Sequence, residues 1–170
     1  AQGAELVPFS PLANAAPDAQ CDAVFLPGGY PELHCERLSR ASQFLTGLRD
    51  AAARRAVIYG ECGGYMVLGE SLTDSDGHAH RMAGLLPVST SFAARRLHLG
   101  YRHLTQAGHL PWPQDLVGHE FHYATILQES AGTPLFQAHD ALGRQLADMG
   151  RVSGSVSGSF AHLIGPDEAG

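Results

Sequence analysis

The stretch from residue 57 to residue 68 constrains the fold most strongly, because it joins a β-like apolar run to a helix-like segment across one cysteine. Its sequence is VIYGECGGYMVL. Gly60 and Gly64 flank Cys62 at minus two and plus two, a spacing that lets a strand turn sharply into a helix and expose a nucleophile. Side chains at the two glycine positions would crowd such a turn. The pattern therefore predicts a strand-turn-helix unit with a reactive cysteine at the turn.

A second interpretation of Cys62 is a buried, inert core residue, since free cysteines are among the most buried residue types. The glycine pair argues against it, and so does Glu61, a charged residue that an apolar core run has no reason to contain. The helix N-terminus would favour thiolate over thiol through its unpaired N–H groups and its dipole. We therefore expect Cys62 to border a cleft as an activated nucleophile.

Strand-like and helix-like patterns alternate along the first half of the chain. The apolar spacing predicts helices over residues 32–53 and 62–70. Short strands are predicted over residues 5–9, 22–26 and 56–59. Elements of this order and length indicate βαβ units, and hence an α/β fold with a mostly parallel central sheet and helices on both faces.

The second half is predicted to be richer in strands. Strands are expected over residues 81–92, 97–104 and 116–127, and a loop over residues 107–113, which contain Pro-Trp-Pro. In the strand around residue 120, His119, Phe121 and Tyr123 would share one face, while Glu120, His122 and Ala124 would share the other.

Composition excludes several classes of protein. The 170 residues are 44% hydrophobic and 16% charged, which is typical of one globular domain. A net charge of -6 gives no basic patch, so no nucleic-acid partner is expected. There is no signal peptide and no apolar run approaching about 18 residues, so we expect no membrane span and a cytoplasmic location.

The cysteines and histidines do not predict a metal site. The three cysteines form no C-x-x-C pair, which also argues against a disulfide framework. Two histidine pairs, His78 with His80 and His119 with His122, have no third ligand at a recognised zinc spacing.

Four motifs follow one another along the chain: FLPGGYPE at residues 25–32, GECGGYM at 60–66, GHEFHY at 118–123 and GSFAH at 158–162. Together they resemble the class I glutamine amidotransferase domain of cobyrinic acid and hydrogenobyrinic acid a,c-diamide synthases, over nearly the whole chain. The resemblance implies a flavodoxin-like domain over residues 1–170, the C-terminal part of a larger synthase. That domain type has a further strand and helix before residues 5–9. Their loss would expose a sheet edge and favour a homodimer.

The resemblance also implies how L-glutamine would be hydrolysed. Cys62 would attack the side-chain amide and form a thioester, while His162 would accept the thiol proton and return it to the departing ammonia. The N–H of Gly63 and one N–H from the loop at Gly29 and Tyr30 would stabilise the oxyanion. Two alternatives stay open: His162 could be an ordinary surface histidine, and the glycine loop could be a plain tight turn.

Glutamine recognition is expected at the strand over residues 118–123. Glu120 would pair with the α-ammonium group, and His122 or a main-chain donor with the α-carboxylate; an ordinary amphipathic strand is the alternative. Most class I amidotransferases place a glutamate two residues after the catalytic histidine, where this chain has Ile164. What orients His162 is therefore open, with Glu120 or another acid as the candidates.

The resembled synthases bind ATP and Mg²⁺ in an N-terminal synthetase domain, which activates the a and c acetate groups of a corrinoid and receives the ammonia. This chain has no G-x-x-x-x-G-K-[ST] phosphate loop, so we expect no cofactor in it. The amidotransferase domain of a cobyric acid synthase or of another synthetase is one alternative. A non-catalytic docking module and an unrelated cysteine hydrolase on the same fold are two others.

Overall fold

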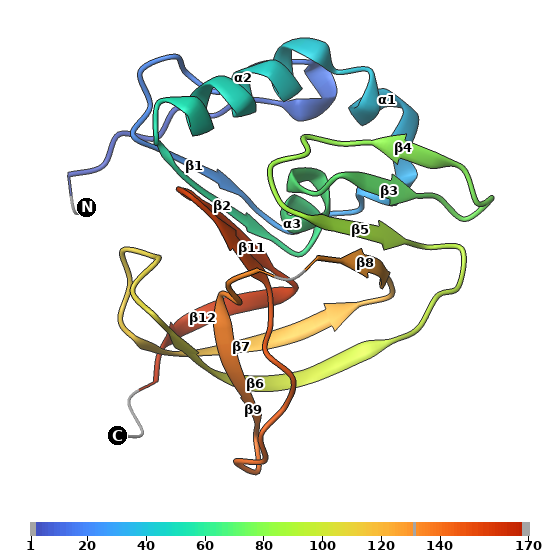
Figure 1. Cartoon of the computed structure of the whole chain (residues 1–170). Helices are drawn as coiled ribbons and strands as arrows, with labels where there is room; N and C mark the ends of the chain where they lie inside the picture. The colour runs from blue at the N-terminus through green and yellow to red at the C-terminus, as the bar shows by residue number, and fades with distance from the viewer. Residues whose placement is uncertain (1–2, 131, 168–170) are drawn as a thin grey trace.

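The computed structural model describes residues 3–130 and 132–167, and the elbow lies at the end of an inner strand of a parallel sheet. In spatial order this sheet contains β1 (Ala23–Leu26), β2 (Val57–Glu61), β11 (Val156–Ser159) and β10 (Arg151–Ser153). Both neighbours of β2 run parallel to it, and β10 pairs antiparallel with β11. The carboxyl ends of the three parallel strands therefore meet at one edge, where ligands bind in α/β sheets (Figure 1).

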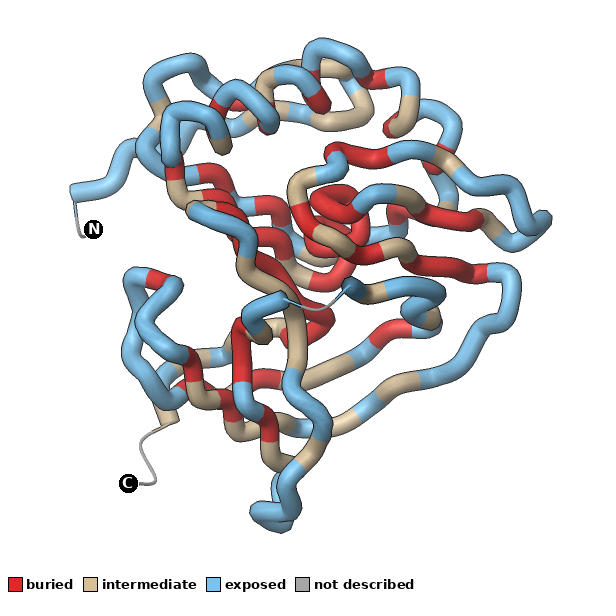
Figure 2. The backbone as a smooth tube through the Cα atoms, viewed as in Figure 1, coloured by how far each residue is buried: buried red, intermediate tan, exposed pale blue. Residues whose placement is uncertain are grey.

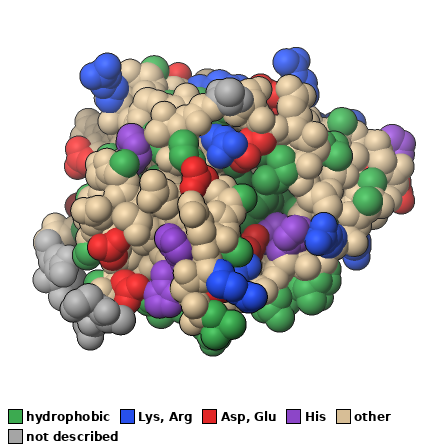
Figure 3. Space-filling model, turned by 60° about the horizontal axis from the view of Figure 1, so that its bottom comes forward, with side chains coloured by type: hydrophobic (Ala, Val, Ile, Leu, Met, Phe, Trp, Pro, Cys, Tyr) green, Lys and Arg blue, Asp and Glu red, His purple; other side chains and the backbone are tan. Residues whose placement is uncertain are grey.

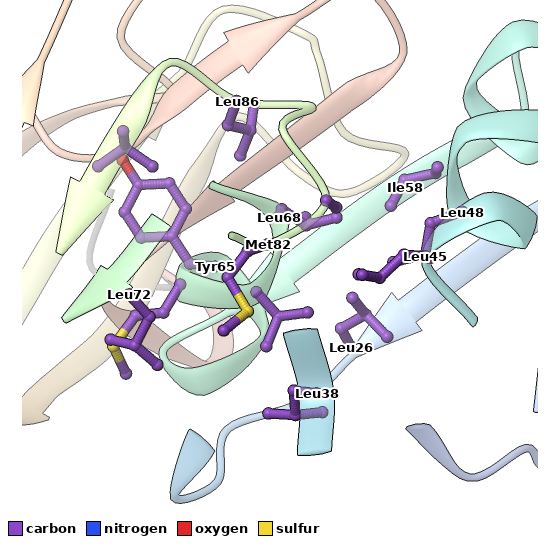
Figure 4. Close-up of a cluster of buried hydrophobic side chains, with 14 of the residues drawn as sticks. Leu26, Leu38, Leu45, Leu48, Ile58, Tyr65, Leu68, Leu72, Met82 and Leu86 are labelled. Atoms are coloured by element: carbon purple, nitrogen blue, oxygen red, sulfur yellow. The ribbon is translucent and has the colours of Figure 1, made fainter. Parts of the chain in front are cut away.

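Helices cover one side of this sheet. They are α1 (Cys35–Ser39), α2 (Ser42–Ala53) and α3 (Gly63–Leu68), with 3-10 turns η1 (Pro11–Ala13) and η2 (Pro31–Leu33). The main core lies between sheet and helices and contains Leu26, Leu48, Ile58 and Leu68 (Figure 4). Successive side chains of β2 point to opposite sides, so Ile58 enters this core and Tyr59 enters another.

An antiparallel sheet covers the other side. Its spatial order is β12 (Ala161–Pro166), β7 (Asp115–His122), β6 (His98–Gln106) and β9 (Phe136–Asp140). Tyr59 packs there with Leu104, Phe136 and Ala161 in a second core. The α/β fold is confirmed, but among the described residues this second side carries a sheet where helices were expected.

A third sheet extends the main core beside α3. It contains β4 (Ala79–Arg81), β3 (Ser71–Thr73), β5 (Val88–Ser91) and β8 (Thr125–Glu129). β3 and β5 are parallel, and the other two pairs are antiparallel. Figure 2 shows that buried residues concentrate along the parallel strands and α3, while the outer loops and strand ends are exposed. No helix within residues 3–130 and 132–167 is long and apolar enough to cross a membrane.

Two predicted elements differ from the observed ones. Residues 5–9 form no strand, because no neighbouring strand pairs with them; Phe9 instead packs against Phe44 of α2, with ring centroids 6.2 Å apart. The helix predicted over residues 32–53 is divided into η2, α1 and α2. The side chain of Asn14 accepts hydrogen bonds from the N–H groups of Gln43 and Phe44, so a distant segment caps the start of α2.

Strand bounds in the second half also shift. The strand predicted over residues 81–92 becomes two, β4 and β5, and the one over residues 116–127 becomes β7 and β8. Residues 107–113 form a loop, as predicted. The two faces of β7 are those predicted, since Phe121 is 45% exposed whereas His122 is buried.

Candidate active site

The backbone at Cys62 forms the predicted elbow. Cys62 has a φ of 49° and a ψ of -101°, a conformation rare for a residue with a side chain, between the end of β2 and the start of α3. A Cβ atom added to Gly60 would lie 2.8 Å from the carbonyl oxygen of Gly64, and one added to Gly64 would lie 2.1 Å from the carbonyl oxygen of Leu26. Gly60 therefore allows α3 to turn back against β2, and Gly64 allows α3 to pack against β1.

The Cys62 thiol is buried and not activated in the way that the sequence suggested. Burial raises the pKa of Cys62 to about 11; the Gly63 backbone N–H lowers it by less, and nearby carboxylates, Glu61 first, raise it further. Its Sγ lies 3.9 Å from the carbonyl oxygen of Phe121. Desolvation outweighs the effect of a helix of only six residues. The thiol is therefore protonated at neutral pH, and attack requires a base.

His162 lies near Cys62 although the two residues are far apart in sequence. It is the second residue of β12, which follows directly on β11, the parallel neighbour of β2. A Cβ atom added to Gly28 would lie 2.5 Å from Cε1 of His162 and 3.6 Å from Cβ of Cys62. The imidazole and the cysteine therefore border the same small space above the Gly28 backbone.

Glu61 is the acid that contacts His162. Its Oε1 lies 3.2 Å from His162 Nδ1, and its Oε2 accepts a hydrogen bond from the Leu163 N–H at 3.1 Å. The structure thus places a carboxylate on the imidazole from β2, whereas Ile164 is 59% exposed. With Nδ1 facing Glu61, Nε2 is the ring nitrogen available for proton transfer. The sequence did mark Glu61 as unusual, because it is a charged residue directly before the cysteine. It did not indicate that His162 would be its partner.

The loop at residues 28–30 lies against the start of α3. A Cβ atom added to Gly63 would lie 2.8 Å from the backbone nitrogen of Gly29 and 3.0 Å from its carbonyl oxygen. Tyr30 follows at the start of η2 with a 70% exposed side chain. The structure thus brings together the two backbone segments that were expected to supply oxyanion donors.

Glu120 does not contact His162 but belongs to a second polar cluster. Its Oε2 accepts hydrogen bonds from Arg102 Nη2 at 2.7 Å and Arg102 Nε at 3.1 Å, and its Oε1 lies 2.8 Å from His122 Nε2. Burial would raise the pKa of Glu120, but the hydrogen bonds from His122 and Arg102 outweigh it and lower the pKa below its ordinary value. Arg102 was not singled out from the sequence, because only strand register brings it beside Glu120.

A metal ion does not fit this second cluster well. Donor atoms of His98, Glu120 and His122 lie within 4.8 Å of one another. However, the rings of His98 and His122 stack with an angle of only 3° between their planes, so their in-plane lone pairs point along parallel planes and do not converge. Both Glu120 oxygens and both His122 nitrogens already have protein partners.

Comparison with known proteins shows the family of the chain. The family model described as the CobB/CobQ-like glutamine amidotransferase domain matches residues 1–169. The chain is 58% identical over 163 residues to hydrogenobyrinate a,c-diamide synthase of Brucella abortus and 54% identical to that of Rhizobium meliloti; 96% of the chain is aligned in both comparisons.

The chain spans 37% and 38% of the lengths of these two relatives, respectively. Among solved structures, a glutamine amidotransferase matches with a TM-score of 0.54 and 17% identity, covering 83% of this chain and 70% of that one, which supports the fold. On the match to the family model over almost its entire length, the chain belongs to the CobB/CobQ-like glutamine amidotransferase domain family.

Proposed function

We propose that this chain hydrolyses the side-chain amide of L-glutamine and delivers the ammonia for corrinoid a,c-diamidation in a larger, cytoplasmic synthase. The observation that carries the proposal is that Cys62 and His162 both border Gly28 while Glu61 contacts His162. A cysteine with a histidine in turn oriented by a carboxylate is the arrangement that nucleophilic acyl transfer requires.

In the proposed reaction, His162 Nε2 takes the Cys62 proton as Sγ attacks the amide carbon. The carbonyl oxygen becomes an oxyanion, stabilised by the Gly63 N–H and by an N–H of Gly29 or Tyr30, where one such donor contributes about 2.7–4 kcal/mol. His162 then protonates the amide nitrogen, the carbon–nitrogen bond breaks, and ammonia leaves a thioester. Water attacks the thioester with His162 as its base, so that glutamate and the free thiol are restored.

Glu61 has a positioning role in this scheme, since it touches His162 and not the substrate. Its carboxylate fixes the ring with Nδ1 toward β2 and stabilises the imidazolium that forms during attack. The high pKa of the thiol makes this necessary, because no preformed thiolate is present at neutral pH.

We further propose that the α-groups of glutamine bind beside Glu120 and His122. Glu120 remains anionic at neutral pH, which suits an α-ammonium group, and the neighbouring Arg102 matches an α-carboxylate. Each contact would have to share a group that is already paired within the cluster.

The remaining chemistry is proposed to take place in a synthetase domain of the kind that the longer relatives imply. ATP and Mg²⁺ would be held there and would activate the corrinoid carboxylates. The residues of this chain do not suit that task, since it contains no lysine and therefore no phosphate-loop lysine. Amidation of another synthetase's acceptor is the alternative, and the identity to two hydrogenobyrinate a,c-diamide synthases favours the first assignment.

The proposal is tested by treating the chain with a glutamine analogue that carries an electrophile, followed by peptide mass spectrometry. We expect one adduct, at Cys62, and none in a His162→Ala variant over the same time. Cys35 is an internal control, since its thiol is also buried and its pKa is also raised to about 11. Labelling of Cys21 or Cys35 with Cys62 unmodified would contradict the mechanism.

A Cys62→Ala substitution tests the delivery of ammonia. In a synthase that carries this sequence as its amidotransferase part, the variant should lose glutamine-dependent amidation and retain amidation with added ammonium salt. Loss of both activities would argue that Cys62 acts on the acceptor reaction or on the fold.

A further inference from the structure

Five large apolar side chains form an exposed face on β6 and β7 and at their ends. This β6–β7 face consists of Leu97, Leu99, Tyr101, Phe121 and Tyr123, which are between 45% and 67% exposed. The register places Leu99 opposite Phe121, so their side chains are neighbours on one side of the ladder. Figure 3 brings this lower side of the molecule forward and shows hydrophobic side chains gathered beside histidine and arginine side chains.

The β6–β7 face is continuous with the reacting groups. The register places Tyr101 opposite His119, and His119 opposite His162 of β12. The ring of His119 stacks on that of His162, with centroids 4.9 Å apart. In addition, the backbone carbonyl of Phe121 lies 3.9 Å from the Cys62 Sγ. One row of side chains therefore leads from the proposed site of ammonia release onto the exposed apolar face.

The product of the proposed reaction limits what can cover this face. Ammonia that escapes into water at neutral pH is protonated and loses the lone pair that makes it a nucleophile. A domain that consumes ammonia must therefore close over the place where it forms. In the two relatives named above, more than half of the chain lies outside the part that this sequence matches.

The composition of the face fits a protein partner. Contiguous apolar patches are uncommon on monomers and mark interaction sites, and aromatic residues and arginine are enriched in interfaces. Two exposed arginines, Arg95 and Arg96, precede β6 and lie at the end of the face that contains Leu97. They predict acidic groups on the partner at that rim.

We propose that the β6–β7 face is the docking surface for the synthetase domain that consumes the ammonia. The inference rests on the proposed function and adds to it the surface through which the two activities are coupled. A second copy of this chain is the competing occupant.

The test uses a chimera in which these 170 residues replace the matched part of the Brucella abortus relative. Leu99→Asp introduces a charge at the centre of the face, at a residue outside the proposed catalytic and binding groups. Leu142→Asp is the matched control, since Leu142 is 79% exposed and lies after β9. Leu99→Gln is a milder second variant if the charged one lowers the unfolding temperature.

We expect Leu99→Asp to lower glutamine-dependent amidation by about tenfold or more, the loss of one interface hot spot. Ammonia-dependent amidation should stay within about twofold of the parent, a change too small to indicate a lost hot spot. Glutamine hydrolysis should continue, with free ammonia accumulating in solution. Leu142→Asp should leave all three rates at the parent level.

Two results would overturn the docking proposal alone. One is that the ratio of glutamine-dependent amidation to glutamine hydrolysis is the same in the Leu99→Asp chimera as in the Leu142→Asp chimera. The other is that Leu99→Asp dissociates a dimer of the 170-residue chain in sedimentation, while coupling in the chimera is unchanged. A parent chimera that hydrolyses no glutamine would instead overturn the proposed function.

Discussion

Two histidine–glutamate pairs lie in neighbouring parts of this molecule, and their surroundings differ in one decisive respect. His162 has one ring nitrogen on Glu61 at 3.2 Å, and its side chain is 25% exposed. His122 has Nε2 at 2.8 Å from Glu120 and Nδ1 at 3.0 Å from the Ala124 carbonyl oxygen, and its side chain is 5% exposed. The imidazole of the first pair is open to a reactant, whereas the imidazole of the second is closed by protein partners at both nitrogens, so that of this second pair only Glu120 is left to meet the substrate.

The difference follows from the strand face that each residue occupies. His119 of β7 points outward and pairs in register with His162, whereas the even-numbered residues of β7 point inward, where His122 stacks on Phe160 with centroids 3.8 Å apart. A ring with one free nitrogen beside a thiol can carry a proton. The His122 ring, in contrast, has protein partners at both nitrogens and stacks on Phe160. It therefore helps to order β7, the strand whose Phe121 carbonyl oxygen contacts the Cys62 thiol.

Exchanging each histidine for glutamine tests which of the two imidazoles carries the proton. His162→Gln should lower the kcat of glutamine hydrolysis by about 10³-fold, within the range that a general acid–base contributes, with little change in stability. His122→Gln should act mainly on stability, because it breaks a buried network. Glutamine hydrolysis is followed as released ammonia, and stability by denaturant unfolding.

Equal loss of kcat in the two variants, with unchanged stability in both, would contradict the distinction between an open and a closed pair. A circular dichroism spectrum at the assay temperature serves as the control, since an unfolded His122→Gln sample would lose activity for a trivial reason. The ratio of the two kcat values in the folded samples is therefore the quantity that decides.

The elbow could be predicted from sequence because its constraints are local. Gly60, Cys62 and Gly64 lie within five residues, and the contacts that require Gly60 come from Gly64 and Leu68 of the same unit, although those that require Gly64 come from Leu26 of β1. The role of Glu61 could not be predicted, since its contact with His162 depends on the pairing of β2 with β11 across about a hundred residues. Arg102 was missed for the same reason: register, not sequence spacing, places it beside Glu120.

The thiolate expected at Cys62 shows a different kind of failure. The sequence indicated a helix start, which lowers the pKa of a cysteine, but not the depth at which that helix start is buried. The prediction of helices on the second side of β2 failed for a similar reason. Alternating strands were predicted for the second half, and nothing in their sequence indicated that they would take the place of helices.

The two carboxylates should also differ in their effects when each is replaced by glutamine. Glu120→Gln should raise the KM for glutamine, because it removes the proposed partner of the α-ammonium group. It should also lower the free energy of unfolding by about 3 kcal/mol, since it leaves Arg102, whose side chain is only 13% exposed, without its ionic partner. Glu61→Gln should lower kcat by about 10²-fold through a misoriented ring, with a smaller effect on unfolding. Urea unfolding and glutamine hydrolysis of both variants give the values needed, and a reversed pattern would contradict the assignment.

Acid titration gives an independent check on Glu120. Its pKa in the folded state lies below the ordinary value of 4.5, so the ionised carboxylate stabilises the fold above that pH. This contribution is lost as the pH falls through the lowered folded value. Unfolding free energy should therefore decrease less steeply below pH 4.5 in Glu120→Gln than in the parent chain. Identical slopes would show that the carboxylate is not held by Arg102 and His122.

The smallest of the proposed changes adds one methyl group to the loop beneath His162 and tests whether the position of the imidazole sets the rate. Gly28→Ala would place Cβ 2.5 Å from His162 Cε1, so the ring must move away from the thiol, and kcat should fall by about tenfold or more. Gly29→Ala is the matched control, because its Cβ would meet no atom within 4 Å and its N–H is retained as an oxyanion donor. Equal kcat values in the two variants would mean that the imidazole position above Gly28 does not set the rate, and that the chemistry uses another base.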